Sequence, residues 1–231
     1  MNIAIILAGG TGSRIGENSP KQFIKIAEKS IIEHSINAFE KNDNVDKISI
    51  VINKDYHAEC NAIIKENNYK KIDKIINGGK ERYESSFNAV KAYEDLDDCN
   101  LIFHDSARPL VSQRIIDETV AALKNYNAVS VAIPTTDTIY KINTTEKTLE
   151  SVLDRSKIFC AQTPQAFKIS IIREAYKLFF ESSNFVATDD CGIVSRFLPN
   201  EKIYIVTGDI KNMKITYKED IDIAEKLLLT I

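Results

Sequence analysis

The stretch MNIAIILAGGTGSRIGENSPKQF (residues 1–23) joins a short apolar run to a glycine-rich loop, and this combination predicts the fold class. Residues 3–7 are apolar on both faces, as expected for a buried strand of a parallel sheet. Gly9, Gly10 and Gly12 then allow a tight turn in which the backbone can approach a ligand closely. Such a turn can hold NAD, the phosphates of ATP, or a nucleotide that is about to be cleaved.

Further apolar runs alternate with segments that have helical spacing. Residues 30–41 and 112–126 each place their apolar side chains on one helical face, with Ser30 and Ser112 as the predicted N-caps. This alternation predicts an α/β protein with a doubly wound, mostly parallel sheet and ligands at the carboxyl ends of its strands. The other strands are expected at residues 47–52, 74–79, 101–105, 128–134 and 202–208.

Residues 135–159 depart from the alternation of strands and helices, because they contain two strand-like pieces around the polar turn NTTEKT and no amphipathic helix. We interpret the segment as a β-hairpin arm that projects from a single domain formed by residues 1–231. A two-stranded arm is marginally stable alone, so we expect it to rest on a second subunit.

The charge and cysteine content exclude several classes of protein. With 30 basic and 33 acidic residues, the chain lacks the basic field typical of nucleic-acid-binding proteins. No apolar stretch approaches the ~20 residues that cross a bilayer, and no secretory leader is present, so we expect a soluble, cytoplasmic protein. The four cysteines form no C-x-x-C pair and the three histidines are scattered, which gives little support to a zinc site or a Ser/His/Asp triad.

Arg14 and Lys21 narrow the interpretation of the glycine loop. The loop has no Gly-Lys pair, which a Walker A motif requires, and no acidic residue after the second strand is clearly placed to bind a ribose. Gly16 and Pro20 lie between the two cations, so the loop can bring both side chains toward the glycine backbone. Backbone N–H groups together with Arg and Lys favour a polyphosphate site.

Two more motifs place polar groups at strand ends. Asp105 follows a buried strand, where a carboxylate is well placed to hold Mg²⁺ together with phosphate oxygens, and Arg108 lies three residues further on. Gly79 again allows close backbone approach, and Ser85 could bind a base or a ribose.

The carboxyl half of the chain contains side chains that could bind a second phosphorylated substrate: Thr138, Arg155, Thr163 and Lys214.

Taken in order, eight motifs resemble the 2-C-methyl-D-erythritol 4-phosphate cytidylyltransferase family, which includes the ribitol-5-phosphate cytidylyltransferases. The similarity extends from Leu7 to Asp220. The motifs are LAGGTGSRIGENSPKQF (7–23), NGGKERYESS (77–86), HDSARPL (104–110), DTI (137–139), DRS (154–156), QTPQAF (162–167), TDD (188–190) and NMKIT (212–216).

The resemblance implies a Rossmann-like nucleotidyltransferase fold, CTP as cosubstrate, Mg²⁺ as the metal, and a homodimer whose arms enter each other's active sites. It implies that Asp105 binds the metal and that the catalytic residues are Arg14, Lys21, Arg155 and Lys214. The nucleotide would contact Leu7, Ala8, Gly9, Gly10, Gly12, Gly79, Lys80, Ser85 and Arg108. The acceptor would contact Thr163 and Lys214, together with Thr138 and Arg155 from the partner's arm.

The motifs favour 2-C-methyl-D-erythritol 4-phosphate as the acceptor, with D-ribitol 5-phosphate as the alternative. Ala107 and the LDRS motif resemble the methylerythritol phosphate enzymes, whereas Tyr140 and residues 189–203 depart from their pattern. Lys80 stands where some of those enzymes have an acid. An acceptor phosphate monoester, with a second pKa near ~6, is largely dianionic at neutral pH, so the reaction needs no general base.

Two other classes of protein could contain the same glycine turn, and both remain as alternatives. An NAD(P)-dependent oxidoreductase would leave Lys21, Asp105 and Lys214 without a role. A non-catalytic nucleotide-binding protein would bind CTP but release no pyrophosphate with any polyol phosphate.

Overall fold

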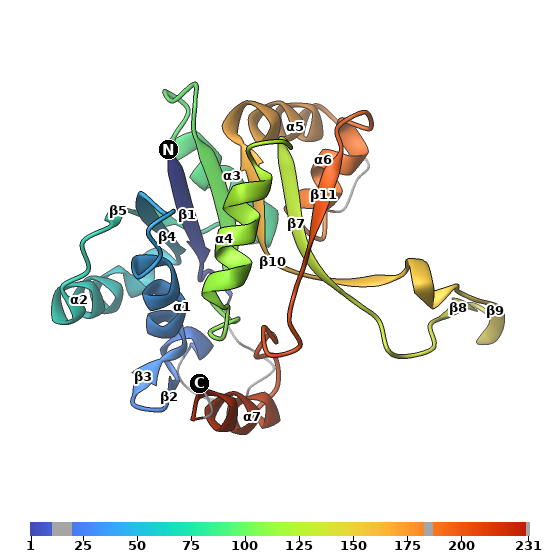
Figure 1. The fold of residues 1–231 in the computed structure, drawn as a ribbon, viewed down its shortest axis with the longest axis horizontal. Helices are drawn as coiled ribbons and strands as arrows, with labels where there is room; N and C mark the ends of the chain where they lie inside the picture. The colour runs from blue at the N-terminus through green and yellow to red at the C-terminus, as the bar shows by residue number, and fades with distance from the viewer. Residues whose placement is uncertain (11–19, 183–186, 230–231) are drawn as a thin grey trace.

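The computed structural model describes residues 1–10, 20–182 and 187–229, whose central element is one mixed sheet. Within these residues the sheet has seven strands in the order β11-β7-β10-β6-β1-β4-β5 (Figure 1). Strand β10 is antiparallel to both of its neighbours, and the remaining pairs are parallel. The strands are β1 (Asn2–Leu7), β4 (Lys47–Ile52), β5 (Ile72–Asn77), β6 (Asn100–Asp105), β7 (Ala128–Pro134), β10 (Phe159–Lys168) and β11 (Ile203–Thr207).

Helices cover both faces of the sheet, which confirms the doubly wound architecture (Figure 1). One core contains apolar residues of α1 (Ile31–Glu40), α2 (His57–Asn67) and α4 (Gln113–Ala122). The opposite core contains residues of α3 (Arg82–Ala92), α5 (Ile169–Glu181) and α6 (Asp190–Phe197). Strands β1 and β4 are packed on both sides, so their residues are apolar in nearly continuous runs rather than in alternation.

The helix starts agree with the capping residues read from the sequence. Ser30, the predicted N-cap of α1, forms a capping box with Glu33, in which the Ser30 N–H donates to Glu33 Oε2 at 2.8 Å. The Ser112 hydroxyl accepts from the Ile115 N–H at the start of α4. These caps satisfy N–H groups that have no partner within the helix.

Two strands differ from the sequence-based expectations. Strand β10 was not among the expected strands, because Pro164 interrupts its pattern and proline rarely lies inside a sheet. The chain accommodates it with a cis Thr163–Pro164 bond and a register shift between Gln162 and Gln165. Strand β5 begins before the expected residue 74, because it lies at the edge of the sheet and its polar Asp73 and Lys74 are exposed.

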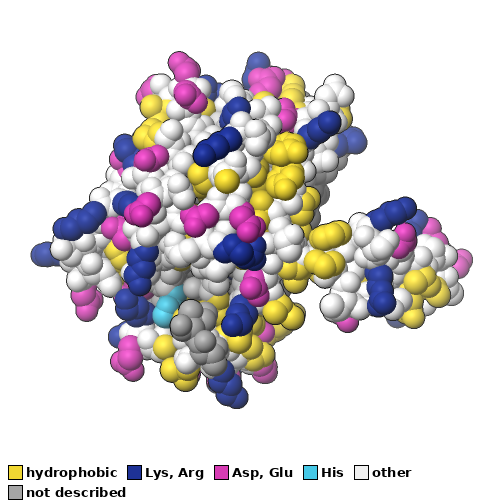
Figure 2. All heavy atoms as spheres, in the orientation of Figure 1, with side chains coloured by type: hydrophobic (Ala, Val, Ile, Leu, Met, Phe, Trp, Pro, Cys, Tyr) yellow, Lys and Arg dark blue, Asp and Glu magenta, His cyan; other side chains and the backbone are white. Residues whose placement is uncertain are grey.

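The arm is a two-stranded hairpin, as predicted, and extends away from the body of the molecule (Figure 1). It contains β8 (Tyr140–Asn143), β9 (Thr148–Val152) and the short helix η3 (Arg155–Lys157). Figure 2 shows it as a lobe joined to the body at one side. Several of its apolar side chains are exposed: Tyr140, Ile142, Leu149, Val152 and Leu153.

The remaining elements lie beside the carboxyl end of β1. They are η1 (Lys21–Phe23), the strand pair β2 (Lys25–Ile26) and β3 (Lys29–Ser30), η2 (Lys54–Tyr56) after β4, and α7 (Glu219–Leu228). Ile26, Ile215 and Ala224 belong to a small third core that joins the start and the end of the chain. None of the described helices is long and apolar enough to cross a membrane.

Candidate active site

A cavity of about 160 Å³ opens beyond the carboxyl ends of β1 and β6, and we call it the β1 cavity. The glycine turn after β1, the start of α3 and the turn after β6 form its walls. It therefore lies where an α/β sheet of this type binds ligands. Ten of the residues singled out in the sequence line it: Leu7, Ala8, Gly9, Gly10, Lys21, Gly79, Lys80, Ser85, Asp105 and Lys214.

Ser85 joins the start of α3 to the glycine pair that precedes it. The Gly79 N–H donates to Ser85 Oγ at 3.0 Å, and the Ser85 hydroxyl donates to the Glu81 carbonyl at 3.3 Å. The Lys80 N–H donates to Glu84 Oε2 at 2.6 Å, and Glu84 also completes the capping box of α3. These bonds hold the wall of the β1 cavity in one conformation.

Replacing Gly79 with alanine should destabilise the protein, because the new Cβ atom would lie 2.2 Å from the Cβ atom of Glu84. We expect the free energy of unfolding to fall by roughly 1–3 kcal/mol, the usual cost of overpacking. Gly10→Ala is the matched control, since among the described residues no atom beyond its chain neighbours lies within 4 Å of the added Cβ. Urea unfolding without nucleotide measures both variants, and equal stabilities would contradict the steric argument.

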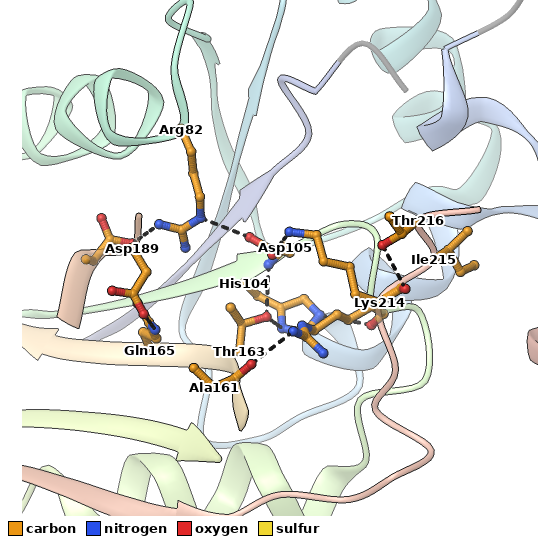
Figure 3. A network of polar contacts seen from close by, with 12 residues as sticks. Arg82, His104, Asp105, Ala161, Thr163, Gln165, Asp189, Lys214, Ile215 and Thr216 are labelled. Atoms are coloured by element: carbon orange, nitrogen blue, oxygen red, sulfur yellow. Dashed lines mark hydrogen bonds and ion pairs between the residues drawn. The ribbon is translucent and has the colours of Figure 1, made fainter. Parts of the chain in front are cut away.

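Asp105, at the end of β6, is the charged centre of the site (Figure 3). Its Oδ1 accepts from Arg82 Nε at 3.3 Å, and its Oδ2 accepts from Lys214 Nζ at 2.8 Å. Burial alone raises the pKa of Asp105, but the charges of Arg82 and Lys214 outweigh this effect and hold the pKa well below its ordinary value. Asp105 is therefore ionised at neutral pH.

Arg82 is a site residue that the sequence reasoning missed. Its Nη1 donates to Asp190 Oδ2 at 2.7 Å, and the Tyr176 hydroxyl donates to Asp190 Oδ1 at 2.6 Å. Arg82 thus bridges the fully buried Asp190 and the site carboxylate Asp105. Its place in the NGGKERYESS motif could have indicated this role, because a cation there follows the glycine pair at the first position of a helix.

A second cavity of about 250 Å³, which we call the β10 cavity, adjoins the first. Arg82, Asp105 and Lys214 line both cavities, so a ligand in either one meets the same charges. Arg108, expected among the nucleotide-binding residues, lines the β10 cavity and not the β1 cavity. Its Nη1 donates to the Asn212 carbonyl at 2.7 Å.

Thr163 also lines the β10 cavity, and its hydroxyl contacts the buried ring of His104. Thr163 Oγ1 lies 3.0 Å from His104 Nδ1 and accepts from the Asp105 N–H at 3.1 Å. Burial lowers the pKa of His104 to about 4, so its ring is neutral at physiological pH.

Lys21 and Lys214 reach the β1 cavity from opposite ends of the sequence. Lys21 is part of η1, and its Nζ donates to the Ile215 carbonyl at 3.2 Å. The Ile215 N–H in turn donates to the Ala107 carbonyl at 2.8 Å, which attaches the 212–216 segment to the turn after β6. The predicted site residues Gly12 and Arg14 lie outside the described residues.

Thr138 and Arg155, which were expected to contact the acceptor, are exposed on the arm. Neither of them lines the β1 or the β10 cavity of its own chain. Arg155 Nη1 donates to the Thr136 carbonyl at 3.3 Å, a bond within the arm. Within one chain, the structure does not bring these two residues together with the rest of the site.

The residues around Asp105 fit a metal ion that is shared with a phosphorylated ligand. Among the described residues no group of three or more His, Cys, Asp or Glu could form an all-protein metal site. Mg²⁺ usually takes only one or two carboxylates and completes its coordination with phosphate oxygens and water. Asp105 could supply the carboxylate, while phosphates would compete for its present partners Arg82 and Lys214.

Comparison with known proteins identifies the family. The family model for 2-C-methyl-D-erythritol 4-phosphate cytidylyltransferase matches residues 2–230. The chain belongs to this family. It is therefore a cytidylyltransferase, a kind of nucleotidyltransferase, and the resemblance found in its motifs is confirmed.

Individual relatives support the same conclusion. The chain is 42% identical to 2-C-methyl-D-erythritol 4-phosphate cytidylyltransferase from Thermobifida fusca, over 98% of this chain and 93% of that protein. It is 41% identical to the bifunctional ribulose 5-phosphate reductase/CDP-ribitol pyrophosphorylase of Haemophilus influenzae, covering 98% of this chain and 48% of that protein.

A solved structure confirms the Rossmann-like nucleotidyltransferase fold. The crystal structure of 4-diphosphocytidyl-2C-methyl-D-erythritol synthase from Anaerococcus prevotii superposes with a TM-score of 0.87 at 29% identity. The superposition covers 99% of this chain and 96% of that one. Family membership decides against the oxidoreductase and the non-catalytic alternatives.

Proposed function

We propose that the protein transfers CMP from CTP to 2-C-methyl-D-erythritol 4-phosphate and releases pyrophosphate. The observation that carries the proposal is the charged centre shared by two adjoining cavities, in which Arg82 and Lys214 flank Asp105. CTP would occupy the β1 cavity and the acceptor the β10 cavity. The family match and the relative from Thermobifida fusca support this choice of substrates.

The nucleotide half of the site would hold CTP through backbone and charge. Gly79 and Ser85 would lie against the cytidine, and the glycine turn after β1 against the phosphates. Lys21, with Arg14 from the glycine loop, would stabilise the negative charge that develops at the α-phosphate. Asp105 would hold Mg²⁺, which when bound supplies positive charge to the triphosphate oxygens.

The reaction then depends on positioning and charge. An oxygen of the acceptor phosphate attacks the α-phosphorus of CTP, and the bond between the α-phosphorus and the bridging oxygen breaks as pyrophosphate leaves. The attacking phosphate, with a second pKa near ~6, is already deprotonated at neutral pH. The neutral, fully buried His104 is consistent with this scheme, since no side chain has to accept a proton.

A pyrophosphate-release assay with CTP tests the function and the acceptor together. We expect the highest kcat/KM with 2-C-methyl-D-erythritol 4-phosphate. D-Ribitol 5-phosphate is the alternative acceptor, favoured by the 41% identity to the Haemophilus influenzae enzyme. A strong preference for ribitol 5-phosphate would replace the proposed acceptor and leave the chemistry unchanged, whereas no release with either acceptor would contradict the transfer itself.

We also propose that the active enzyme is a homodimer in which each arm rests on the other subunit. Its exposed apolar side chains, including Leu149 and Val152, support this arrangement, because an isolated hairpin is only marginally stable. Figure 2 shows hydrophobic side chains both on the arm and on the adjoining edge of the body. Thr138 and Arg155 would then reach the acceptor bound by the partner subunit.

Introducing charge on the arm should dissociate the dimer. We expect Leu149→Lys combined with Val152→Lys to give a monomer by sedimentation velocity, with most of the transferase activity lost. Lys147→Glu, in the turn of the same hairpin, is the control and should leave a dimer. A wild-type monomer with full activity would contradict the proposed exchange of arms.

A further inference from the structure

His104 is a fully buried side chain between residues that line the β10 cavity and the core of the sheet. Its ring packs on Phe39, with ring centroids 5.1 Å apart. Its Nε2 lies 3.0 Å from the Arg108 carbonyl oxygen, and its Nδ1 lies 3.0 Å from Thr163 Oγ1. Each ring nitrogen therefore has one partner, and both partners are residues that line, or continue into, the β10 cavity.

The hydrogen-bonding groups around His104 allow one arrangement of protons. A carbonyl oxygen cannot donate, so His104 Nε2 must carry the hydrogen and donate it to Arg108. The ring is fully buried and both of its partners are uncharged oxygens, which do not compensate a buried charge, so the imidazole is neutral. In a neutral imidazole the other nitrogen is then an acceptor, so Nδ1 receives the hydroxyl hydrogen of Thr163. Thr163 Oγ1 meanwhile accepts from the Asp105 N–H at 3.1 Å. The hydroxyl proton of Thr163 thus points into the protein.

We infer that His104 is a positioning residue for the transfer reaction, which fixes the Asp105–Arg108 turn against β10 and directs the Thr163 hydroxyl proton away from the acceptor. The inference rests on the proposed function. With its proton bound to His104, Thr163 can offer a ligand only an oxygen lone pair. It can accept from a hydroxyl of the polyol, but it cannot donate to a phosphate oxygen.

This arrangement divides recognition of the acceptor between two kinds of group. The phosphate, which only accepts hydrogen bonds when it is dianionic, is left to the cations that line the β10 cavity, Arg82, Arg108 and Lys214. Thr163 would contact a hydroxyl of the acceptor instead. Asn212 Nδ2 donates to the Thr163 carbonyl at 2.8 Å, and this second hydrogen bond also fixes the position of Thr163.

Nitrogen-15 NMR of the histidine rings tests the proton arrangement in the unmodified protein. The chain has three histidines, and His34→Asn and His57→Asn assign the other two sets of signals. We expect His104 to carry hydrogen on Nε2 and none on Nδ1, both in the free enzyme and with 2-C-methyl-D-erythritol 4-phosphate added. A protonated Nδ1 in either state would overturn the inference.

A double-mutant cycle measured by steady-state kinetics tests whether the hydrogen bond between Thr163 and His104 supports transfer to the acceptor. Thr163→Val keeps the shape of the side chain without its hydroxyl, and His104→Phe keeps a ring without its nitrogens. Each should lower kcat/KM for the acceptor by roughly ten- to a hundredfold, since each leaves buried polar groups unpaired. The double variant should be no slower than the slower single variant, because both changes remove the same hydrogen bond.

Thr163→Ser restores the hydroxyl that Thr163→Val lacks, so it should recover most of the kcat/KM that Thr163→Val loses. Effects of the two single variants that multiply in the double variant would show that Thr163 acts on the acceptor independently of His104, and would overturn the inference. Far-ultraviolet circular dichroism and thermal unfolding check that each variant is folded. If a variant does not fold, the NMR experiment on the protein with native His104 decides whether the inference holds.

Failure of the proposed function has a different signature. In that case the wild-type enzyme would release no pyrophosphate with the polyol phosphates, while the ring nitrogens of His104 would still show the expected protonation. If transfer occurs but the NMR and the cycle disagree with expectation, the proposed function stands and the positioning role of His104 does not.

Discussion

Lys21→Ala is expected to lower kcat for cytidylyl transfer by about a hundred- to a thousandfold, the usual cost of removing one group that stabilises transition-state charge. Lys21 lines the β1 cavity, and its position between the glycine turn and the 212–216 segment places its charge beside the expected phosphates. The fold should be retained, since Lys21 belongs to a three-residue helix and is only partly buried. Steady-state pyrophosphate release measures kcat, and thermal unfolding measures the fold.

Arg14→Ala, predicted from the sequence to act on the same phosphate, should cause a loss of similar size. Lys25→Ala is the matched control, because Lys25 is an exposed lysine four residues further along that lines neither cavity. It should keep kcat within about twofold. Near-normal turnover in both Lys21→Ala and Arg14→Ala would contradict the assignment of these cations to the α-phosphate.

Asp190→Asn is expected to have the largest effect on stability, lowering the free energy of unfolding by about 3 kcal/mol. Asp190 is fully buried, accepts from Arg82 at 2.7 Å and accepts from the buried Tyr176 hydroxyl at 2.6 Å. Replacing its charge leaves the Arg82 guanidinium in a largely buried position, with the more distant Asp105 as its remaining carboxylate partner among the described residues. Urea unfolding monitored by circular dichroism gives the difference.

The matched control is Glu118→Gln, which also removes a carboxylate paired to arginine. The Arg114–Glu118 pair is 2.8 Å long, but both side chains are nearly half exposed. Water and salt screen such pairs, so the expected change is within roughly 1 kcal/mol. Equal losses in the two variants would mean that burial of the Arg82–Asp190 pair does not determine its contribution.

Much of the fold could be predicted from local patterns. The runs at 47–52 and 128–134 are strands with those same bounds, and the caps at Ser30 and Ser112 begin α1 and α4. Apolar runs and capping residues act over a few neighbouring positions, so they can be read without knowledge of distant contacts. The exception was β10, because its pairing with β6 and β7 depends on tertiary contacts that no local pattern shows.

The candidate site was predicted in part for the same reason. Gly79, Ser85 and Asp105 stand at strand ends or helix starts, where local sequence indicates a ligand, and all three line the β1 cavity. Arg82 was missed because its role depends on Asp190, which is 108 positions away in the sequence. No local pattern reveals that these two residues meet.

The sequence by itself determined the alternation of strands and helices, the projecting arm and the membership of a cytidylyltransferase family, since these depend on local periodicity and on motifs in a set order. Only the tertiary structure decided which charges surround Asp105 and which way the Thr163 hydroxyl points. His104 and Thr163 are 59 positions apart, and they meet because β10 inserts antiparallel beside β6. Hydrogen-bond direction is set by such long-range packing, where each buried donor must find an acceptor.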